Sequence, residues 1–164
     1  MSYLIRKATE HDVPGMMQLV RELAEFERAP GEVVTNEATL LRDGFGPNAI
    51  YKAFVAEEAD TNRIIGMALY YTAYSTWKGR MLFLDDLIVT QSYRGLGIGR
   101  RLMDEFLREA QREGVKQVRW QVLNWNTPAI GFYRTLGAFL DEEWITCKMS
   151  DEQINKYFHK NTSQ

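Results

Sequence analysis

The stretch that decides the fold runs from Met81 to Glu113 and reads MLFLDDLIV, TQSY, RGLGIG and RRLMDEFLREAQRE. Its first nine residues are apolar almost throughout, which is typical of a buried strand, although Asp85 and Asp86 interrupt them. In its last part, apolar residues recur at the spacing of a helix: Leu102, Met103, Phe106, Leu107 and Ala110. Between the two parts, glycines stand at alternate positions beside arginines. The stretch therefore predicts a strand, a glycine-rich turn and an amphipathic helix.

The glycine-rich turn, Arg94-Gly95-Leu96-Gly97-Ile98-Gly99, is a candidate phosphate site. Glycines let the backbone approach an anion closely, and the following helix offers free N–H groups and the positive end of its dipole. A dinucleotide-binding motif would need a third glycine where Arg100 stands, and a P-loop would need Gly-Lys-Ser/Thr after the turn. A turn that merely connects strand and helix does not require this many glycines flanked by arginines. The pattern that remains is Arg-x-x-Gly-x-Gly after a strand, and it favours a phosphate cradle.

The bulk composition is that of an ordinary globular protein. The chain has 164 residues, 45% of them hydrophobic, and a formal net charge of −2, which suits one domain, residues 1–164, with a sizeable core. The charge argues against a non-specific nucleic-acid binder. The single cysteine, Cys147, excludes an internal disulfide framework and fits a reducing compartment. With no apolar signal segment at the N-terminus and no long uncharged apolar run, we expect a cytoplasmic protein that does not engage a membrane.

The order of predicted elements indicates an α/β fold. Strands are expected over residues 3–7, 51–57, 64–74, 81–89, 117–123 and 138–149. Helices are expected to begin after Thr9, after Thr35, after the glycine-rich turn, at Pro128 and after Ser150. The early strands are joined by short turns and the later ones alternate with helices. This order predicts a mixed, partly parallel central sheet with helices on both faces.

Several local signals together resemble the GNAT superfamily of N-acetyltransferases. The strand, Arg94–Gly99 and helix match its cofactor motif, and Asn126-Thr127-Pro128 with Tyr133 matches the segment after its next strand. More narrowly, the chain is similar to the spermidine/spermine N-acetyltransferase family through LVRELAEFE, DGFG, YSTWKGR, LFLDDLIV, YRGLGIG, LNWNTPAIGFY and LGA, which span residues 19–138 in order. The YSTWKGR segment looks closest to the thialysine branch. Where the polyamine branch has Asp-Pro, this chain has Ser75-Thr76, which removes one carboxylate expected to grip a polyamine.

The resemblance implies an acetyl-CoA site between the 86–89 end of the central strand and the strand that ends at Leu123. The backbone of Leu87 and Val89 would bind the pantetheine arm, while their side chains pack in the core. Amides of the glycine-rich turn would hold the pyrophosphate. The full set of implied cofactor contacts is Leu87, Ile88, Val89, Arg94, Gly95, Leu96, Gly97, Ile98, Gly99, Arg100, Asn126, Pro128, Ala129 and Tyr133.

The resemblance also makes Tyr133 the candidate general acid. CoA leaves the reaction as a thiolate whose parent thiol has a pKa of about 8.5, and a phenol near the sulfur can supply its proton. From the residues alone, a helix tyrosine that packs its ring and leaves its hydroxyl in solvent is the favoured interpretation of this position.

Asp85 and Asp86 are the candidates for handling the acceptor's proton. A lysine-like amine has a pKa of about 10.4, so it arrives protonated and must lose a proton before it attacks. Adjacent strand residues face opposite sides, so we expect one aspartate to face the substrate and the other the structure. The resemblance puts Asp85 at the base or relay position, and its side chain, shorter than glutamate, favours a relay through water. A buried aspartate satisfied by backbone N–H groups remains an equal interpretation of Asp86.

The acceptor pocket implied by the resemblance is lined by Phe26, Glu27, Trp77 and Trp144 beside the two aspartates. Aromatic faces and carboxylates suit an alkylammonium group through cation–π attraction and charge pairing, although each residue alone is more often core or surface. Cys147 lies near no histidine in the sequence. Two scattered histidines and one cysteine make no ligand cluster, so no metal is expected.

The function that these features favour is direct transfer of acetyl from acetyl-CoA, in a ternary complex, to the primary amine of a small substrate, either a thialysine- or lysine-like amino acid or a diamine or polyamine. The alternatives are a peptide or protein amine acetyltransferase and a non-catalytic CoA-binding regulator. The resemblance further implies a homodimer whose subunits both contribute to the amine sites.

Overall fold

The computed structural model describes residues 2–160, which fall into two compact units divided after Gln121. The first unit contains β1 (Tyr3–Lys7), η1 (Glu10–Asp12), α1 (Val13–Phe26), η2 (Pro30–Glu32), α2 (Glu37–Phe45), β2 (Lys52–Glu58), β3 (Ile64–Ser75), β4 (Gly79–Val89), η3 (Gln91–Tyr93), α3 (Ile98–Arg112) and β5 (Val118–Trp120). The second unit contains α4 (Thr127–Thr135) and α5 (Asp151–Lys160). None of the described helices is long and apolar enough to cross a membrane.

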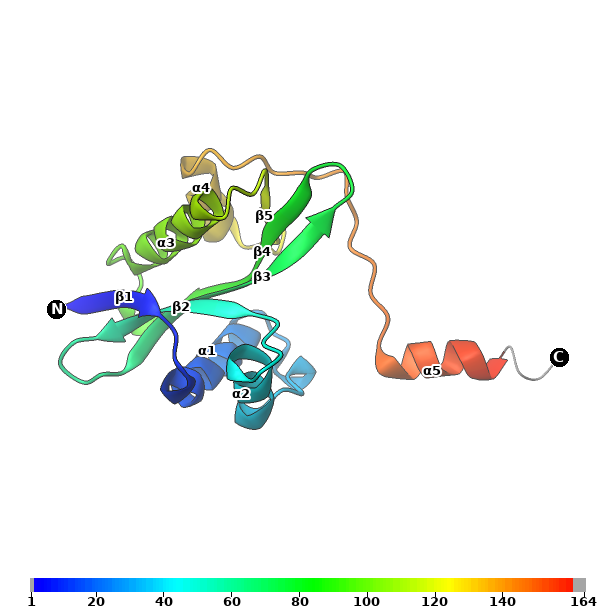
Figure 1. Ribbon diagram of the computed structural model, residues 1–164, viewed down its shortest axis with the longest axis horizontal. Helices are drawn as coiled ribbons and strands as arrows, with labels where there is room; N and C mark the ends of the chain where they lie inside the picture. Colours follow the sequence, from blue (N-terminus) through cyan, green and yellow to red (C-terminus); the bar gives the residue numbers. More distant parts are fainter. Residues whose placement is uncertain (1, 161–164) are drawn as a thin grey trace. The chain divides into compact units, whose positions relative to one another are not determined.

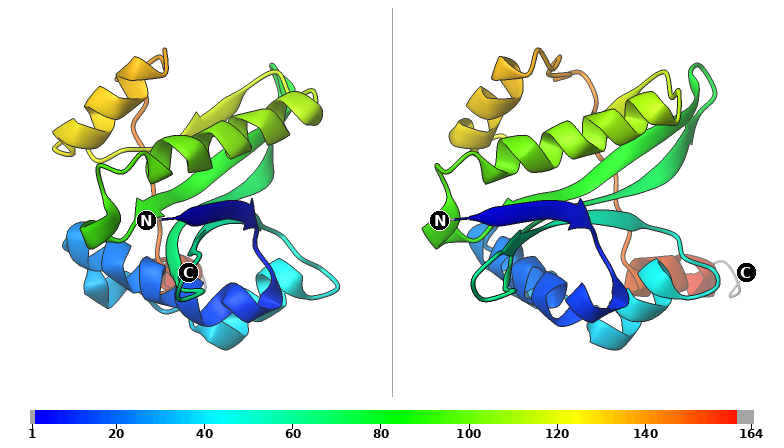
Figure 2. Two further views of the ribbon diagram at one scale, coloured as in Figure 1. Left: turned by 90° about the vertical axis from the view of Figure 1, so that its left-hand side faces the viewer. Right: turned by 60° about the vertical axis from the view of Figure 1, so that its left-hand side comes forward.

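The first unit is a five-stranded sheet in the order β1-β2-β3-β4-β5 (Figure 1). The first four strands pair antiparallel, whereas β4 and β5 pair parallel and are connected through α3. Figure 2 shows α1 and α2 on one face of this sheet and α3 on the other. The predicted mixed sheet with helices on both faces is thus confirmed.

Each face of the sheet has its own apolar packing. On the α1 face, Met16 and Met17 are fully buried and belong to one core cluster with Met67 and Leu69 of β3. The opposite, α3 face carries an aromatic layer: Tyr70 stacks on Phe54 at 5.7 Å between ring centroids and lies 5.4 Å from Phe106 of α3. Because β3 alternates side chains between these two layers, it is buried on both faces over most of its length.

A β-bulge in β4 controls which way the two aspartates face. Opposite β3, Leu69 pairs with Asp86 and Tyr70 pairs with Leu84, so Asp85 is an extra residue in the ladder. Before the bulge, Phe83 stacks on Tyr71 at 5.3 Å, on the α1 face. After it, Ile88 belongs to the α1-side core cluster.

The bulge therefore overturns one expectation. Side chains two residues apart on a strand share a face. Asp85 therefore lies on the same face as Phe83 before the bulge, and Asp86 lies on the same face as Ile88 after it. Both carboxylates consequently lie on the α1 face. The prediction that they face opposite sides was wrong because an inserted residue breaks the alternation.

The expected last strand, residues 138–149, is also wrong. Within the described residues this segment has no strand partner, and Phe139, Trp144 and Ile145 are exposed. A run of β-favouring residues becomes a strand only when its backbone pairs with another strand. The following helix does begin as predicted, because Ser150 N–H donates to Gln153 Oε1 at 2.8 Å and Gln153 N–H donates to Ser150 Oγ at 3.2 Å.

Candidate active site

The glycine-rich turn has the backbone geometry of an anion site. Gly95 and Gly97 have φ of +80° and +79°, a conformation that residues with a Cβ rarely adopt. Gly97 is the N-cap of α3, no side chain caps the helix, and its first turn contains no acidic residue. The N–H groups of that first turn therefore have no intrahelical acceptor and suit the oxygens of a diphosphate.

Arg94 holds this turn against its surroundings. Its Nε donates to the carbonyl oxygen of Val89 at 2.9 Å, and its guanidinium lies 5.0 Å from the ring centroid of Phe26. The side chain thus connects the turn to the ends of β4 and α1. In the structure, these two contacts of the Arg94 side chain hold the turn in position. A contact between Arg94 and the cofactor stays a prediction.

The backbone of β4 offers an open edge beside the glycine-rich turn. The described ladder with β5 joins Leu82–Leu84 to Val118–Trp120 and goes no further, whereas β4 continues to Val89. On that side, residues 85–89 have no strand partner in the described ladder. An amide-bearing chain such as pantetheine can hydrogen-bond to such an edge, so the residues present fit acetyl-CoA at both its pantetheine and its diphosphate parts.

The conformation of Gly97 leads to a first prediction. We expect Gly97→Ala to raise KM for acetyl-CoA by about tenfold and to lower the free energy of unfolding by about 1 kcal/mol, because a Cβ is strained at this φ. Gly114→Ala is the matched control: Gly114 has φ of +65° at the other end of α3, and a Cβ would meet nothing within 4 Å at either position. Steady-state kinetics and urea unfolding measure both effects. An equal KM change in the two variants would contradict a cofactor role for the turn.

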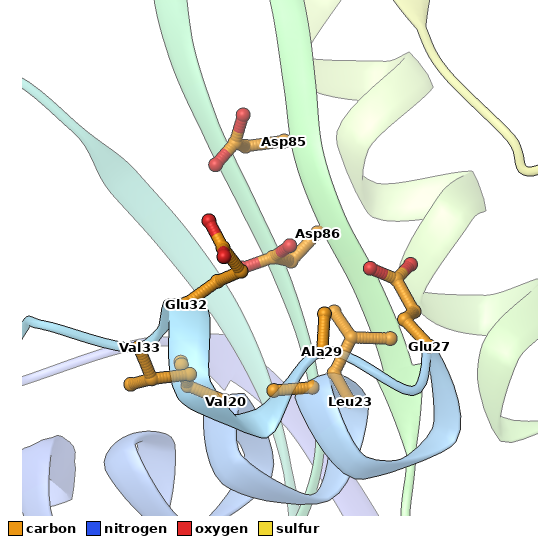
Figure 3. A pocket seen from close by; sticks show the side chains of 9 residues that line it. Val20, Leu23, Glu27, Ala29, Glu32, Val33, Asp85 and Asp86 are labelled. Atoms are coloured by element: carbon orange, nitrogen blue, oxygen red, sulfur yellow. The ribbon is translucent and has the colours of Figure 1, made fainter. Parts of the chain in front are cut away.

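A cavity of about 370 Å³ lies between α1, the turn after it and β4, and its size is that of a small-molecule site. It is lined by Val20, Leu23, Ala24, Glu27, Ala29, Glu32, Val33, Asp85 and Asp86. Figure 3 shows the two aspartates projecting from β4, with Glu27 and Glu32 reaching in from the end of α1 and the turn that follows. Three predicted acceptor-site residues, Glu27, Asp85 and Asp86, therefore meet in one hollow.

Burial and mutual repulsion shift the pKa values of the aspartates. Loss of solvation is the main cause that raises the pKa of Asp86 to about 7, and the charges of Asp85 and Glu27 raise it further. Loss of solvation also raises the pKa of Asp85 above its ordinary value. Around neutral pH the pair can thus hold or release a proton, which is the property required of a general base.

The structure does not bring all predicted acceptor residues into this cavity. Trp77 lies in the β3–β4 turn, where Ser75 Oγ accepts from its N–H, and its side chain is 83% exposed. Phe26 lies at the end of α1 under Arg94 and is not among the lining residues. Trp144 belongs to the second unit. Their contacts with an acceptor stay predictions.

The second unit carries the remaining predicted residues on α4. Asn126 Oδ1 accepts from Ala129 N–H at 3.3 Å, so the asparagine caps the helix that Pro128 helps to begin. Tyr133 is buried, with its ring 5.4 Å from that of Phe132, and burial raises the pKa of its phenol to about 12. The phenol therefore keeps its proton throughout the physiological range.

Sequence reasoning missed Glu32 and the apolar wall of the cavity. Val20, Leu23 and Ala24 lie on α1, and three further lining residues, Ala29, Glu32 and Val33, come from η2 and its two flanking residues. Only the resemblance at Phe26 and Glu27 pointed to this part of the chain. No motif marks Glu32.

Comparison with known proteins agrees with this geometry. The model of the acetyltransferase (GNAT) family matches residues 15–138. A thialysine N-epsilon-acetyltransferase of Sus scrofa is 41% identical over 143 residues, covering 84% of each chain, and one of Mus musculus is 37% identical over 161 residues, covering 93% of this chain and 95% of the relative. A solved integron cassette protein from the mobile metagenome of V. cholerae shares the fold with a TM-score of 0.77 at 24% identity, covering 96% of this chain and 98% of its own.

The sheet, the glycine-rich turn and the open edge of β4 thus define an enzyme of the acyltransferase class. The chain belongs to the GNAT family of acetyltransferases. It is an N-acetyltransferase, and acetyltransferases of this family use acetyl-CoA. Within the described residues, no group of three or more histidine, cysteine, aspartate and glutamate side chains is arranged to hold a metal ion.

Proposed function

We propose that this enzyme acetylates the primary amine of a small, cationic acceptor that binds in the carboxylate-lined cavity, in the class of thialysine- or lysine-like amino acids and diamines. The observation that carries the proposal is the β4 bulge, which turns both Asp85 and Asp86 into that cavity at the start of the open backbone edge. The names of the relatives, thialysine N-epsilon-acetyltransferases, support an acceptor of this kind.

In the proposed reaction, the two aspartates act as one proton-accepting pair. Acetyl-CoA supplies the acetyl group as a thioester, and the acceptor attacks it directly in a ternary complex. Asp86 draws the ammonium into the cavity and takes up its proton, which frees the nitrogen lone pair. Asp85 is more exposed than Asp86 and relays the proton to water. The titration belongs to the pair rather than to either residue alone, because their charges interact.

Tyr133 is the proposed general acid. Its phenol would donate a proton to the departing sulfur, and its raised pKa ensures that the proton is present at every working pH. This role rests on the resemblance of the α4 segment to the family and on the burial of the side chain.

We further propose that the two units act as one acetyltransferase domain in a cytoplasmic homodimer. The family match, which runs through the boundary at residue 121, supports the single domain. Trp77 is exposed and does not line the acceptor cavity of its own chain, which fits a contribution of its side chain to the acceptor site of a partner subunit. Sedimentation equilibrium of the purified protein tests the dimer.

A CoA-release assay across a panel of amines tests the acceptor class. The panel holds thialysine, lysine, ornithine, putrescine, spermidine, spermine and a lysine-containing peptide. We expect kcat/KM for the best small amine to exceed that for the peptide by at least tenfold, because the cavity of about 370 Å³ has the size of a small-molecule site. Preference for the peptide would overturn the proposal, and CoA binding without turnover on any amine would support a non-catalytic regulator.

A further inference from the structure

Glu32 reaches the acceptor cavity through an unusual reversal of the chain. After α1, Arg28 adopts φ of +60°, and the η2 turn folds back, with Glu32 N–H donating to the carbonyl oxygen of Ala29 at 3.0 Å. This reversal returns Glu32 to the same cavity that Glu27 lines from the helix end. The four carboxylates thus line the cavity from three elements: Glu27 from the end of α1, Glu32 from η2, and the two aspartates from β4 (Figure 3).

The charges around the cavity are strongly one-sided. Four of its nine lining residues carry carboxylates, the other five are apolar, and none is basic. Among residues 2–160, the Glu32 carboxylate has no ion-pair or hydrogen-bond partner, whereas Glu57, Glu109 and Glu113 are all paired with arginines. A site of this composition attracts cations and repels anionic groups.

The cavity offers a cation more than the aspartate pair on β4. Glu32 adds a carboxylate that has no ion-pair or hydrogen-bond partner among residues 2–160. The ammonium that reacts is assigned to the aspartate pair on β4. Glu32 lines the cavity from the turn after α1, a different element from the strand that carries the aspartates, and is suited to a second positive group on the same acceptor.

We infer that Glu32 is a specificity-determining residue that binds the second ammonium group of the acceptor and disfavours acceptors with a free carboxylate beside it. This inference rests on the proposed function and refines its acceptor class to dications.

Three amines built on the same five-carbon chain separate these contributions. Pentylamine has one ammonium group, cadaverine has two, and lysine adds a carboxylate to the two of cadaverine. The wild-type enzyme should rank cadaverine first by kcat/KM. In Glu32→Gln, the ratio of kcat/KM for cadaverine to that for pentylamine should fall about fivefold, the effect of one solvent-exposed charge pair. The ratio for lysine over cadaverine should rise, because a repulsive charge is gone.

Glu25→Gln is the matched control, since Glu25 is an exposed glutamate of α1 that does not line the cavity. It should leave both ratios at the wild-type values. Ratios in Glu32→Gln that equal those of the wild type and Glu25→Gln would overturn the inference. Because Glu32 is exposed, its substitution does not threaten folding.

Calorimetric titration with cadaverine, in the absence of acetyl-CoA, separates this inference from the proposed function. Weaker binding to Glu32→Gln than to the wild type, by about the same factor, supports the role of Glu32 even if no amine releases CoA. Equal binding to the two proteins overturns it, whatever the assay of turnover shows.

Discussion

Asp86→Asn should lower kcat by at least a hundredfold and, at the same time, stabilise the folded protein at alkaline pH. The loss of turnover follows from the loss of the proton acceptor, because general-base catalysis typically contributes a factor of 10² to 10⁴. The wild-type kcat/KM should rise with pH around an apparent pKa near 7, the value for Asp86 in the free enzyme. In the variant, this rise should disappear. A pH–rate profile of both proteins measures the effect.

The gain in stability follows from the direction of the pKa shift. The pKa of Asp86 is raised from 3.8 to about 7, so between these values the folded protein binds more protons than the unfolded chain. Stability therefore falls as pH rises through this window, and above pH 7 the ionised carboxylate destabilises the fold in full. Replacing it by asparagine should raise the free energy of unfolding at pH 8 by on the order of 2–4 kcal/mol and have little effect at pH 4.

Two controls make the test of Asp86 specific. Asp60→Asn alters an exposed aspartate in the β2–β3 turn and should change neither turnover nor the pH dependence of unfolding. Asp85→Asn should reduce activity less than Asp86→Asn and shift the apparent pKa of the remaining aspartate downward, since a neighbouring negative charge is removed. A full alkaline rise in the activity of Asp86→Asn would show that another group accepts the proton.

The strand, turn and helix around Arg94–Gly99 could be predicted from the sequence because each depends on local signals. A nine-residue apolar run, glycines at alternate positions and apolar residues at helical spacing act within a few residues of one another. The positive φ of Gly95 and Gly97 agrees with the need for glycine at those positions. The family resemblance rested on the same segments, and the comparisons confirm it.

The features that the sequence did not reveal depend on pairing between distant segments. The bulge at Asp85 exists only in the register between β3 and β4, and two adjacent aspartates look the same with or without it. Glu32 enters the cavity because the chain reverses at Arg28, a residue type that rarely adopts positive φ. Residues 138–149 have the composition of a strand, but composition does not provide a partner to pair with.

Tyr133→Phe should lower kcat by about a hundredfold with little change in the affinity for acetyl-CoA. The substitution removes only the hydroxyl, so the buried ring of Tyr133 continues to pack against Phe132. Without a proton donor, the sulfur must leave as a thiolate. The fall in kcat should therefore be smaller for acceptors with more nucleophilic amines. Single-turnover kinetics together with calorimetric binding of CoA separate the chemical step from cofactor affinity.

The raised pKa of Tyr133 predicts how this acid appears in the pH profile. Because the phenol titrates at about 12, its ionisation should produce no alkaline decline in the wild-type rate below pH 10. Tyr74→Phe is the matched control, since Tyr74 is 78% exposed at the end of β3, and it should retain wild-type kcat. Unchanged turnover in Tyr133→Phe would remove the general-acid role and leave solvent as the source of the proton. A fall in kcat that occurs in Tyr133→Phe and not in Tyr74→Phe, with CoA affinity intact, would identify this phenol as the proton donor.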